Sequence, residues 1–335
     1  MSLLFLTDER FLDHVAGRNH PECPERLEAV WLGLEKLNLE SDLIRVEPRM
    51  VTEEELLRCH PSKYIKDLVA LHESGGGRLD PDTSMSQGSW KAARLAAGSG
   101  LTAVEKLQSG EGDLAFCAIR PPGHHATPRR SMGFCLLNNI SITASALAEA
   151  GEKVAVIDID AHHGNGTQEI FYSDPRVLVV SIHQWPFYPG TGSENEIGIS
   201  EGAGFTVNVP LPAKAAGNTY RSATENIIVP LVEKFKPDWI LVSAGFDAHR
   251  SDPLTDMGLT SADYSDLIFS LFKLAPKNRC ILFLEGGYDL EALTNSVAAS
   301  VAPIMNCDYR PESPTGDGPG LDVVERVARL HGVSL

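Results

Sequence analysis

The segment KVAVIDIDAHHGNGTQ, residues 153–168, decides the fold class and locates the chemistry. Its first part, VAVIDI over residues 154–159, is apolar at successive positions, which is typical of a strand covered on both faces. Its second part gathers aspartates, histidines and glycines. An apolar strand that ends in such a cluster predicts a buried parallel sheet with a site at its carboxyl edge.

Similar apolar runs recur on both sides of this segment and alternate with helical patterns. Strands are predicted over residues 114–119, 154–159, 177–182, 205–209, 239–244 and 280–285. Helices are predicted over residues 24–37, 61–72, 87–107, 138–150, 218–235, 261–274, 290–302 and 322–330. Because alternating strands and helices require crossover connections, the sequence predicts an α/β three-layer sandwich with a mostly parallel central sheet.

No internal repeat or dividing linker interrupts this pattern, so we expect one domain over residues 1–335. The long irregular segments 75–86 and 183–203 exceed ordinary connector length, and we expect them to form loops around a site.

Composition bounds the class of protein. The chain has 335 residues, 43% of them hydrophobic, with 29 Lys+Arg against 45 Asp+Glu and a net charge of −16. This apolar content suffices for a large core and excludes a disordered chain, collagen or a small disulfide scaffold. The acidic excess argues against nucleic acid or an anionic membrane as partner and leaves a cationic ligand open. The acidity could equally serve solubility alone.

The six cysteines include no Cys-x-x-Cys pair, which favours a reducing compartment. The N-terminal MSLLFLTDER lacks the basic start of a signal peptide, and no apolar stretch reaches the ~18 residues of a membrane span. We therefore expect a cytoplasmic protein. The sequence leaves its oligomeric state open.

Unusual polar clusters follow five of the predicted strands directly. They are RPPGHH (120–125), DIDAHHGNG (158–166), SIH (181–183), GFDAH (245–249) and GGY (286–288). Because the carboxyl ends of parallel strands form the crevice where ligands bind, the five clusters predict one shared site.

Three residues of these clusters suit a metal ion. Asp160 and His162 are two positions apart in an extended segment, so their side chains emerge on one face, and Asp247 follows another strand. Three oxygen and nitrogen ligands leave a position open, as in catalytic zinc sites. Two carboxylates and a neutral imidazole cancel a dication's charge, which suits zinc and would accept ferrous or cobalt ions. The alternative is a solvated loop with a capping aspartate.

Two further features suit catalysis. The adjacent His124 and His125 could share acid and base duties, with Asp158 and Asn165 as orienting partners of different basicity. The pair could instead ligate metal in a binuclear site. Tyr288, after two glycines, could donate its hydroxyl to a developing oxyanion or simply pack in the core.

Taken together, RPPGHHA, DIDAHHGNGTQ, SAGFDAHRSDP and EGGYDL resemble the histone deacetylase superfamily, in particular its class II branch and bacterial amidohydrolase relatives. The resemblance runs from His20 to beyond Tyr288. It implies the arginase-like α/β sandwich and a zinc-dependent amide hydrolase that removes acetyl or other short acyl groups from lysine side chains.

The resemblance also implies a role for each site residue. One zinc ion per chain would be held by Asp160, His162 and Asp247. Catalysis would use His125 as general base and acid with Asn165, His124 as its electrostatic partner with Asp158, and Tyr288 as a donor to the substrate carbonyl. Structural potassium would be held at one site by Asp158, Ser181 and the backbones of Asp160, His162 and Ile182, and at a second by backbone around Phe171, Asp174 and Val177.

Further residues would contact the substrate or product. Phe134 and Tyr188 would flank the acyl-lysine tunnel, where Tyr188 replaces the commoner phenylalanine. The Gly133 carbonyl would accept a hydrogen bond from the N–H of the substrate amide. Arg26 would line the channel through which acetate leaves. Asp82, placed by its position in a loop, could clamp a peptide backbone.

The resemblance leaves alternative functions open. Acetylpolyamine amidohydrolases share the catalytic residues, but the similar ones carry a long dimerising insertion where this chain has only residues 74–83. The polyamine-selective class IIb form places glutamate where this chain has Leu254. Both points favour acetylated lysine peptides or proteins over acetylated polyamines. A binuclear manganese ureohydrolase and a non-catalytic reader are the remaining alternatives.

Overall fold

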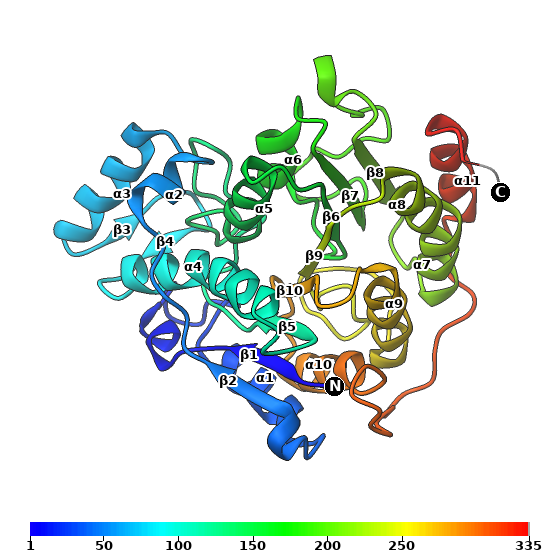
Figure 1. Ribbon diagram of the computed structural model, residues 1–335, viewed down its shortest axis with the longest axis horizontal. Helices are drawn as coiled ribbons and strands as arrows, with labels where there is room; N and C mark the ends of the chain where they lie inside the picture. The colour runs from blue at the N-terminus through cyan, green and yellow to red at the C-terminus, as the bar shows by residue number, and fades with distance from the viewer. Residues whose placement is uncertain (334–335) are drawn as a thin grey trace.

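The apolar runs, with two shorter ones near the N-terminus, form one sheet in the computed structural model, which describes residues 1–333 except the side chain of Ser41. The strands are β1 (Leu3–Leu6), β2 (Leu43–Val46), β5 (Leu114–Cys117), β6 (Val154–Asp158), β7 (Val177–Gln184), β8 (Thr206–Leu211), β9 (Trp239–Ala244) and β10 (Cys280–Leu284). Within the described residues their order is β2-β1-β5-β10-β9-β6-β7-β8, and neighbouring strands are parallel (Figure 1).

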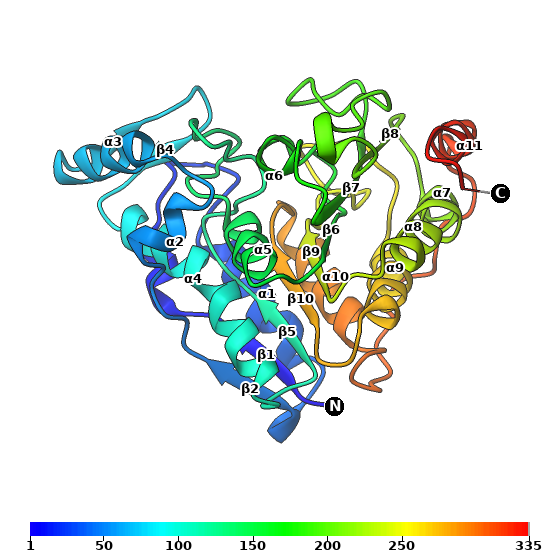
Figure 2. The same ribbon diagram turned by 45° about the horizontal axis from the view of Figure 1, so that its top comes forward.

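Helices cover both faces of the sheet, which gives three layers (Figure 1, Figure 2). One face packs against α4 (Ser89–Gln108), α5 (Asn139–Glu149) and α6 (Asn165–Phe171), with α2 (Glu53–Leu57) and α3 (Ser62–Glu73) outside them. The other side of the sheet is covered by α1 (Glu25–Glu35), α7 (Gly217–Ala223), α8 (Val229–Phe235), α9 (Ser261–Leu274), α10 (Leu290–Val301) and α11 (Leu321–Leu330) (Figure 1, Figure 2). The predicted α/β sandwich with a mostly parallel sheet is confirmed.

The helix predicted over residues 218–235 is interrupted. A π-helical turn, Thr224–Ile228, separates α7 from α8, and Pro230 stands at the start of α8. Proline has no N–H to donate within a helix, so the wider turn precedes the point where the regular ladder would fail. Short elements complete the chain: η1 (Glu9–Asp13), η2 (Glu40–Asp42), η3 (Ser200–Gly202) and the hairpin of β3 (Gly77–Arg78) and β4 (Ser84–Met85).

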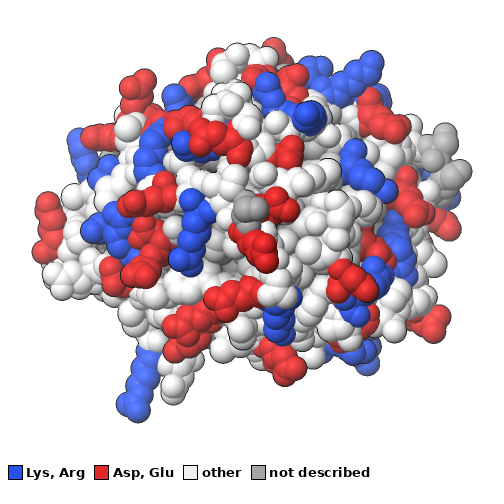
Figure 3. Space-filling view, turned by 60° about the horizontal axis from the view of Figure 1, so that its bottom comes forward, with Lys and Arg blue, Asp and Glu red and all other residues white. Residues whose placement is uncertain are grey.

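The central strands β6, β9 and β10 are buried along their whole length, as their uninterrupted apolar runs require. The apolar side chains of these strands fill the core, and the polar side chains that follow the strands lie at the carboxyl edge of the sheet. On the face drawn in Figure 3, acidic and basic side chains are interspersed, so this face shows no broad field of one charge. Among residues 1–333, no helix has both the length and the apolar character to cross a membrane.

Candidate metal centre and catalytic site

The sheet order brings four of the predicted clusters together. β5, β10, β9 and β6 are consecutive neighbours. The loops that leave their carboxyl ends carry the His124–His125 pair after β5, Tyr288 after β10, Asp247 after β9, and Asp160 with His162 after β6. Residues up to 164 positions apart in the chain therefore meet at one edge because the strands are parallel.

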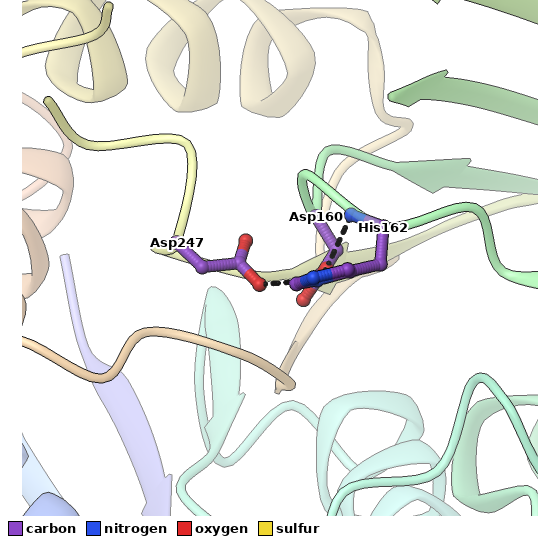
Figure 4. A group of neighbouring side chains, drawn as sticks. All are labelled: Asp160, His162 and Asp247. Carbon is purple, nitrogen blue, oxygen red and sulfur yellow. Dashed lines mark hydrogen bonds and ion pairs between the residues drawn. The ribbon is translucent and has the colours of Figure 1, made fainter. Parts of the chain in front are cut away.

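Asp160, His162 and Asp247 point toward one another (Figure 4). Each offers one ligand atom, and these atoms lie within 4.8 Å of one another. The Nδ1 of His162 is 2.9 Å from Oδ2 of Asp247 and 3.2 Å from Oδ1 of Asp160. All three side chains are buried. This donor set, with two oxygens and one nitrogen, matches a catalytic zinc site in residue type and number.

Backbone groups hold the two carboxylates in place. Ala161 donates its N–H to Oδ1 of Asp247, and Gly286 donates to Oδ2 of Asp160, both at 2.8 Å. A Cβ on Gly286 would lie only 2.2 Å from Oδ2 of Asp247. Glycine at position 286 therefore allows the backbone to approach the carboxylates closely.

The electrostatics of the three side chains suit a dication. Burial and the neighbouring charge of Asp160 raise the pKa of Asp247 to about 7. Burial opposes a charge on His162, but Asp247 and Asp160 outweigh it and raise the pKa of His162 to about 10. Two buried carboxylates are costly to ionise side by side, and a bound dication removes that cost while displacing the imidazole proton. The residues present therefore fit zinc.

The two catalytic histidine candidates have different orienting partners. His124 Nδ1 lies 2.9 Å from Oδ2 of Asp158, and His125 Nδ1 lies 2.8 Å from Oδ1 of Asn165. Because an amide oxygen only accepts, the Nδ1 of His125 carries the hydrogen and its Nε2 is left with the lone pair. The two rings lie side by side with centroids 4.0 Å apart.

These partners separate the basicities of the pair. Burial opposes a charge on His124, but Asp158, Asp160 and Glu285 together raise its pKa well above the ordinary value. For His125, burial together with the charges of His124 and His162 lowers the pKa well below the ordinary value. The pair therefore consists of a charged and a neutral imidazole, an arrangement that can divide acid and base roles.

Tyr288 is held by two residues beside it. Its backbone N–H donates to Oδ2 of Asp252 at 2.7 Å, and the guanidinium of Arg26 lies 4.8 Å from the centroid of its ring. Burial raises the pKa of Tyr288. The phenol therefore stays protonated at neutral pH and can donate a hydrogen bond.

Aromatic side chains lie beside the histidine pair and Tyr288. The ring of Phe134 is perpendicular to that of Tyr288, with centroids 5.7 Å apart, and the ring of Tyr188 is 5.3 Å from that of His125. The Tyr188 hydroxyl is buried and has no hydrogen-bond partner among the described residues. Burial and the nearby Asp82 raise the pKa of Tyr188.

The loop of Gly133 and Phe134 is tightly constrained. Both residues have left-handed backbone conformations, with φ of 55° and 68°. A Cβ on Gly133 would lie 2.3 Å from Cδ2 of His125. The N–H of Gly133 donates to Oδ1 of Asp82 at 3.2 Å, so the structure joins the hairpin loop to this wall.

The remaining predicted residues lie at different depths. Arg26 is fully buried and donates to the carbonyl of Gly287 at 2.6 Å. Leu254 is half-buried, and its N–H donates to Oδ1 of Asp252 at 2.9 Å. Both therefore lie on segments that connect to Tyr288.

The residues of the expected potassium sites fall beside two places along β7, its middle and its start. Asp158 and Ser181 face each other in the β6–β7 register, next to Ile182. Phe171, Asp174 and Val177 lie where the chain enters β7, and Asp174 donates its N–H to the Phe171 carbonyl at 3.0 Å. Potassium binding at either place remains a prediction.

Several buried charges near the site have no role predicted from the sequence. Glu285 and Asp252 lie inside the quoted motifs EGGYDL and SAGFDAHRSDP, which is the signal that could have drawn attention to them. Glu22 and Arg120 form a fully buried ion pair, with Nη2 of Arg120 2.7 Å from Oε2 of Glu22. Their neighbours in the sequence do not reveal it, because the two residues are far apart in the chain.

Comparisons with known proteins agree with this architecture. The family model of the histone deacetylase domain matches residues 20–304. An uncharacterized protein of Synechocystis sp. is 42% identical over 300 residues, covering 88% of this chain and 97% of its own. A probable deacetylase of Archaeoglobus fulgidus is 41% identical over 289 residues, covering 84% of this chain and 80% of its own.

A solved structure is similar over nearly the whole fold. The crystal structure of the HDA15 HD domain superposes with a TM-score of 0.90 at 35% identity, covering 98% of this chain and 94% of that one. The region matched by the family model contains the loops that carry the His124–His125 pair, the three metal-ligand candidates and Tyr288. The chain therefore belongs to the histone deacetylase family of amide hydrolases.

Proposed function

We propose that residues 1–335 form a single catalytic domain, a zinc-dependent deacylase that hydrolyses the amide bond of acetyl-lysine or another short acyl-lysine. The observation that carries this proposal is the convergence of three metal-ligand candidates, a polarised histidine pair and a protonated tyrosine at one edge of the sheet. Together these groups can polarise an amide carbonyl, activate a water molecule and protonate the leaving amine, which are the needs of amide hydrolysis.

Asp160, His162 and Asp247 would hold one zinc ion. When bound, zinc would supply a Lewis acid that polarises the amide carbonyl and acidifies a water molecule. The backbone N–H groups of Ala161 and Gly286 orient the carboxylates of Asp247 and Asp160, so the His162 ring is not needed to hold them.

His125 is the general base in this proposal. Its Nδ1–H donates to Asn165, which leaves Nε2 free to take a proton from the attacking water. The lowered pKa keeps the ring neutral before the reaction begins. The proton held at Nε2 can then pass to the leaving amine of lysine.

His124 contributes mainly through its charge. With Asp158 at 2.9 Å from Nδ1, the ring stays protonated beside His125 and stabilises negative charge that develops in front of the pair. It also offers a second source of the proton that the leaving amine needs.

Tyr288 would donate its hydroxyl to the carbonyl oxygen as that oxygen becomes negative. Arg26 packs its guanidinium against the ring of Tyr288, and Asp252 accepts the backbone N–H of Tyr288. Both contacts keep the tyrosine in place. Phe134 and Tyr188 would enclose the methylene chain of the acyl-lysine arm. The Gly133 carbonyl would accept the substrate amide N–H, and Asp82 would bind the backbone of a peptide.

Two features support acyl-lysine over acetylpolyamine as substrate. The segment 74–83 holds only strand β3 and the short loop of its hairpin rather than a long insertion, and Leu254 stands where a glutamate would bind a second amine. Arg26 would line the exit route of acetate. We expect structural potassium at two places that the chain provides: one at Asp158, Ser181 and the backbones of Asp160, His162 and Ile182, and one at the backbone of Phe171, Asp174 and Val177.

A cytoplasmic location remains a prediction, to which the unpaired state of the six cysteines, all within the described residues, lends support.

The test compares substrates directly. Purified, zinc-loaded protein is incubated with an acetyl-lysine peptide, longer acyl-lysine peptides and N-acetylputrescine, and kcat/KM is measured for each. We expect the highest value for a short acyl-lysine peptide. A higher kcat/KM for N-acetylputrescine would favour the polyamine function, and no amide hydrolysis at all would refute the proposal.

A further inference from the structure

Glu285 is a fully buried carboxylate beside the site that takes no direct part in the proposed chemistry, since its charge raises the pKa of His124 less than the charges of Asp158 and Asp160 do. Its side chain is 0% exposed, at the point where β10 ends and the loop to Tyr288 begins. Its Oε2 accepts the backbone N–H of Gly123 at 2.7 Å and that of His124 at 3.1 Å. One carboxylate oxygen therefore binds the two consecutive N–H groups of the loop that presents the histidine pair.

The other oxygen of this carboxylate faces a hydroxyl. Ser243 Oγ lies 3.5 Å from Oε1 of Glu285, and Ser243 is itself fully buried on β9. Glu285 thus lies between β5 and β9, the two strands that flank β10 in the sheet. Its side chain connects the loop after β5 to its own strand across the sheet edge.

The backbone of the same segment is anchored from the opposite side. Arg26 donates to the carbonyl of Glu285 at 2.5 Å and to the carbonyl of Gly287 at 2.6 Å. The segment 285–287 is therefore bound to Arg26 through its carbonyls and to the histidine loop through the Glu285 side chain. Tyr288 follows immediately, so one short segment sets the position of the tyrosine relative to both imidazoles.

Few other groups could replace Glu285 in this loop. The ring of His124 contacts Asp158, and the ring of His125 contacts Asn165, but those contacts orient the imidazoles. The N–H groups of Gly166 and Thr167 donate to the His124 carbonyl at 3.0 and 3.2 Å, which holds the far side of the loop but does not pair its own N–H groups. Without the carboxylate, the N–H groups of Gly123 and His124 would be buried and unpaired. Because an unpaired buried N–H group is unfavourable, the loop would move until these groups find other partners. A shift of about 1 Å at a reacting group can reduce the rate about 10²-fold.

We propose that Glu285 is a positioning residue for deacylation, which holds the His124–His125 loop at a set distance from Tyr288 through the hydrogen bonds its Oε2 accepts from Gly123 and His124. The inference rests on the proposed function for its kinetic consequence. Its structural part, the pairing of the two N–H groups, is independent of that function.

Three substitutions separate position from charge. Glu285→Gln keeps the length of the side chain, its amide oxygen can accept both N–H groups, and its NH₂ can face Ser243, but the charge is lost. Glu285→Asp keeps the charge and withdraws the oxygens by about 1.5 Å, one carbon–carbon bond. Glu285→Ala removes both. We expect kcat to fall less than about 3-fold for Gln, but about 10²-fold for Asp and Ala, with KM within about 2-fold of wild type throughout.

Asp263 provides a matched control. It is a buried carboxylate that accepts backbone N–H groups from Thr260 and Thr315 at 3.0 Å, in the first turn of α9. Asp263→Ala should lower the thermal midpoint of unfolding but leave kcat of the folded protein unchanged. Kinetics are normalised to bound zinc in every variant, so that a loss of fold or metal is not counted as a loss of positioning.

Hydrogen–deuterium exchange gives a readout that does not depend on activity. In Glu285→Ala, and in Glu285→Asp if the alanine variant does not fold, amides in the peptide spanning residues 121–126 should exchange faster than in wild type. Unchanged exchange, an alanine variant with kcat within 3-fold of wild type, or high activity of the aspartate but not the glutamine variant would each overturn the inference. An inactive wild type with faster exchange in the variants would refute the proposed function alone.

Discussion

Substitution of Gly133 by alanine tests whether the position of His125 limits the reaction. A Cβ at residue 133 would lie 2.3 Å from Cδ2 of His125, where ordinary contact begins at 3.4 Å, so the ring must move by about 1 Å. The Nδ1 to Oδ1 bond between His125 and Asn165, now 2.8 Å, would then be stretched or broken. We expect kcat to fall about 10²-fold, the loss typical of a 1 Å misplacement of a catalytic group.

The left-handed backbone of Gly133, with φ of 55°, adds a separate cost of about 1–2 kcal/mol for any residue with a Cβ. Gly110→Ala is the control, because Gly110 has φ of 78° and a Cβ added there would meet nothing within 4 Å. Both variants should lose stability in thermal unfolding, Gly133→Ala more because of its clash with His125, but only Gly133→Ala should lose kcat on an acetyl-lysine peptide. Turnover of folded Gly133→Ala within 3-fold of wild type would refute the reasoning.

Three further predictions follow from single contacts. Tyr288→Phe should lower kcat by about 10²–10³ with little change in KM, as for loss of one oxyanion donor, and near wild-type turnover in steady-state assays would exclude that role. Asp247→Ala should lose zinc and activity together, and full zinc occupancy by elemental analysis would contradict the ligand set. Glu312 binds His249 at 2.9 Å, and its pKa is lowered to about 2, since hydrogen bonds from His249 and Ser261 outweigh burial. The charge of Glu312 therefore contributes its full stabilisation above pH 4.5 and loses it as the pH falls toward 2. Glu312→Gln should lower the free energy of unfolding at pH 7 by about 1–3 kcal/mol, and thermal unfolding should show this difference shrinking below pH 4.5. A difference that does not depend on pH would show that the charge is irrelevant.

The central strands could be predicted from the sequence because burial on both faces requires continuous apolar runs. The sequence does not predict β1 and β2, since the apolar run of β1 is only four residues long, and β2 is a half-buried edge strand whose short run is interrupted by Arg45. The candidate site could be predicted because its residues follow strand ends, and parallel strands bring those ends together.

The supporting contacts could not be predicted in the same way. Glu22 and Arg120 pair across 98 positions, and Glu285 reaches the N–H of His124 across 161. No local pattern indicates that these charges are buried, because their partners are set by the packing of the whole sheet. Hydrophobic periodicity, the strongest signal in a sequence, carries no information on such polar contacts.

Zinc titration tests most directly whether one metal ion drives the reaction. Protein freed of metal by a chelator is titrated with zinc while hydrolysis of an acetyl-lysine peptide is measured. We predict no activity without metal and a linear rise that ends at one zinc per chain. Activity in the metal-free protein, or a requirement for two metal ions per chain, would contradict the proposed zinc site.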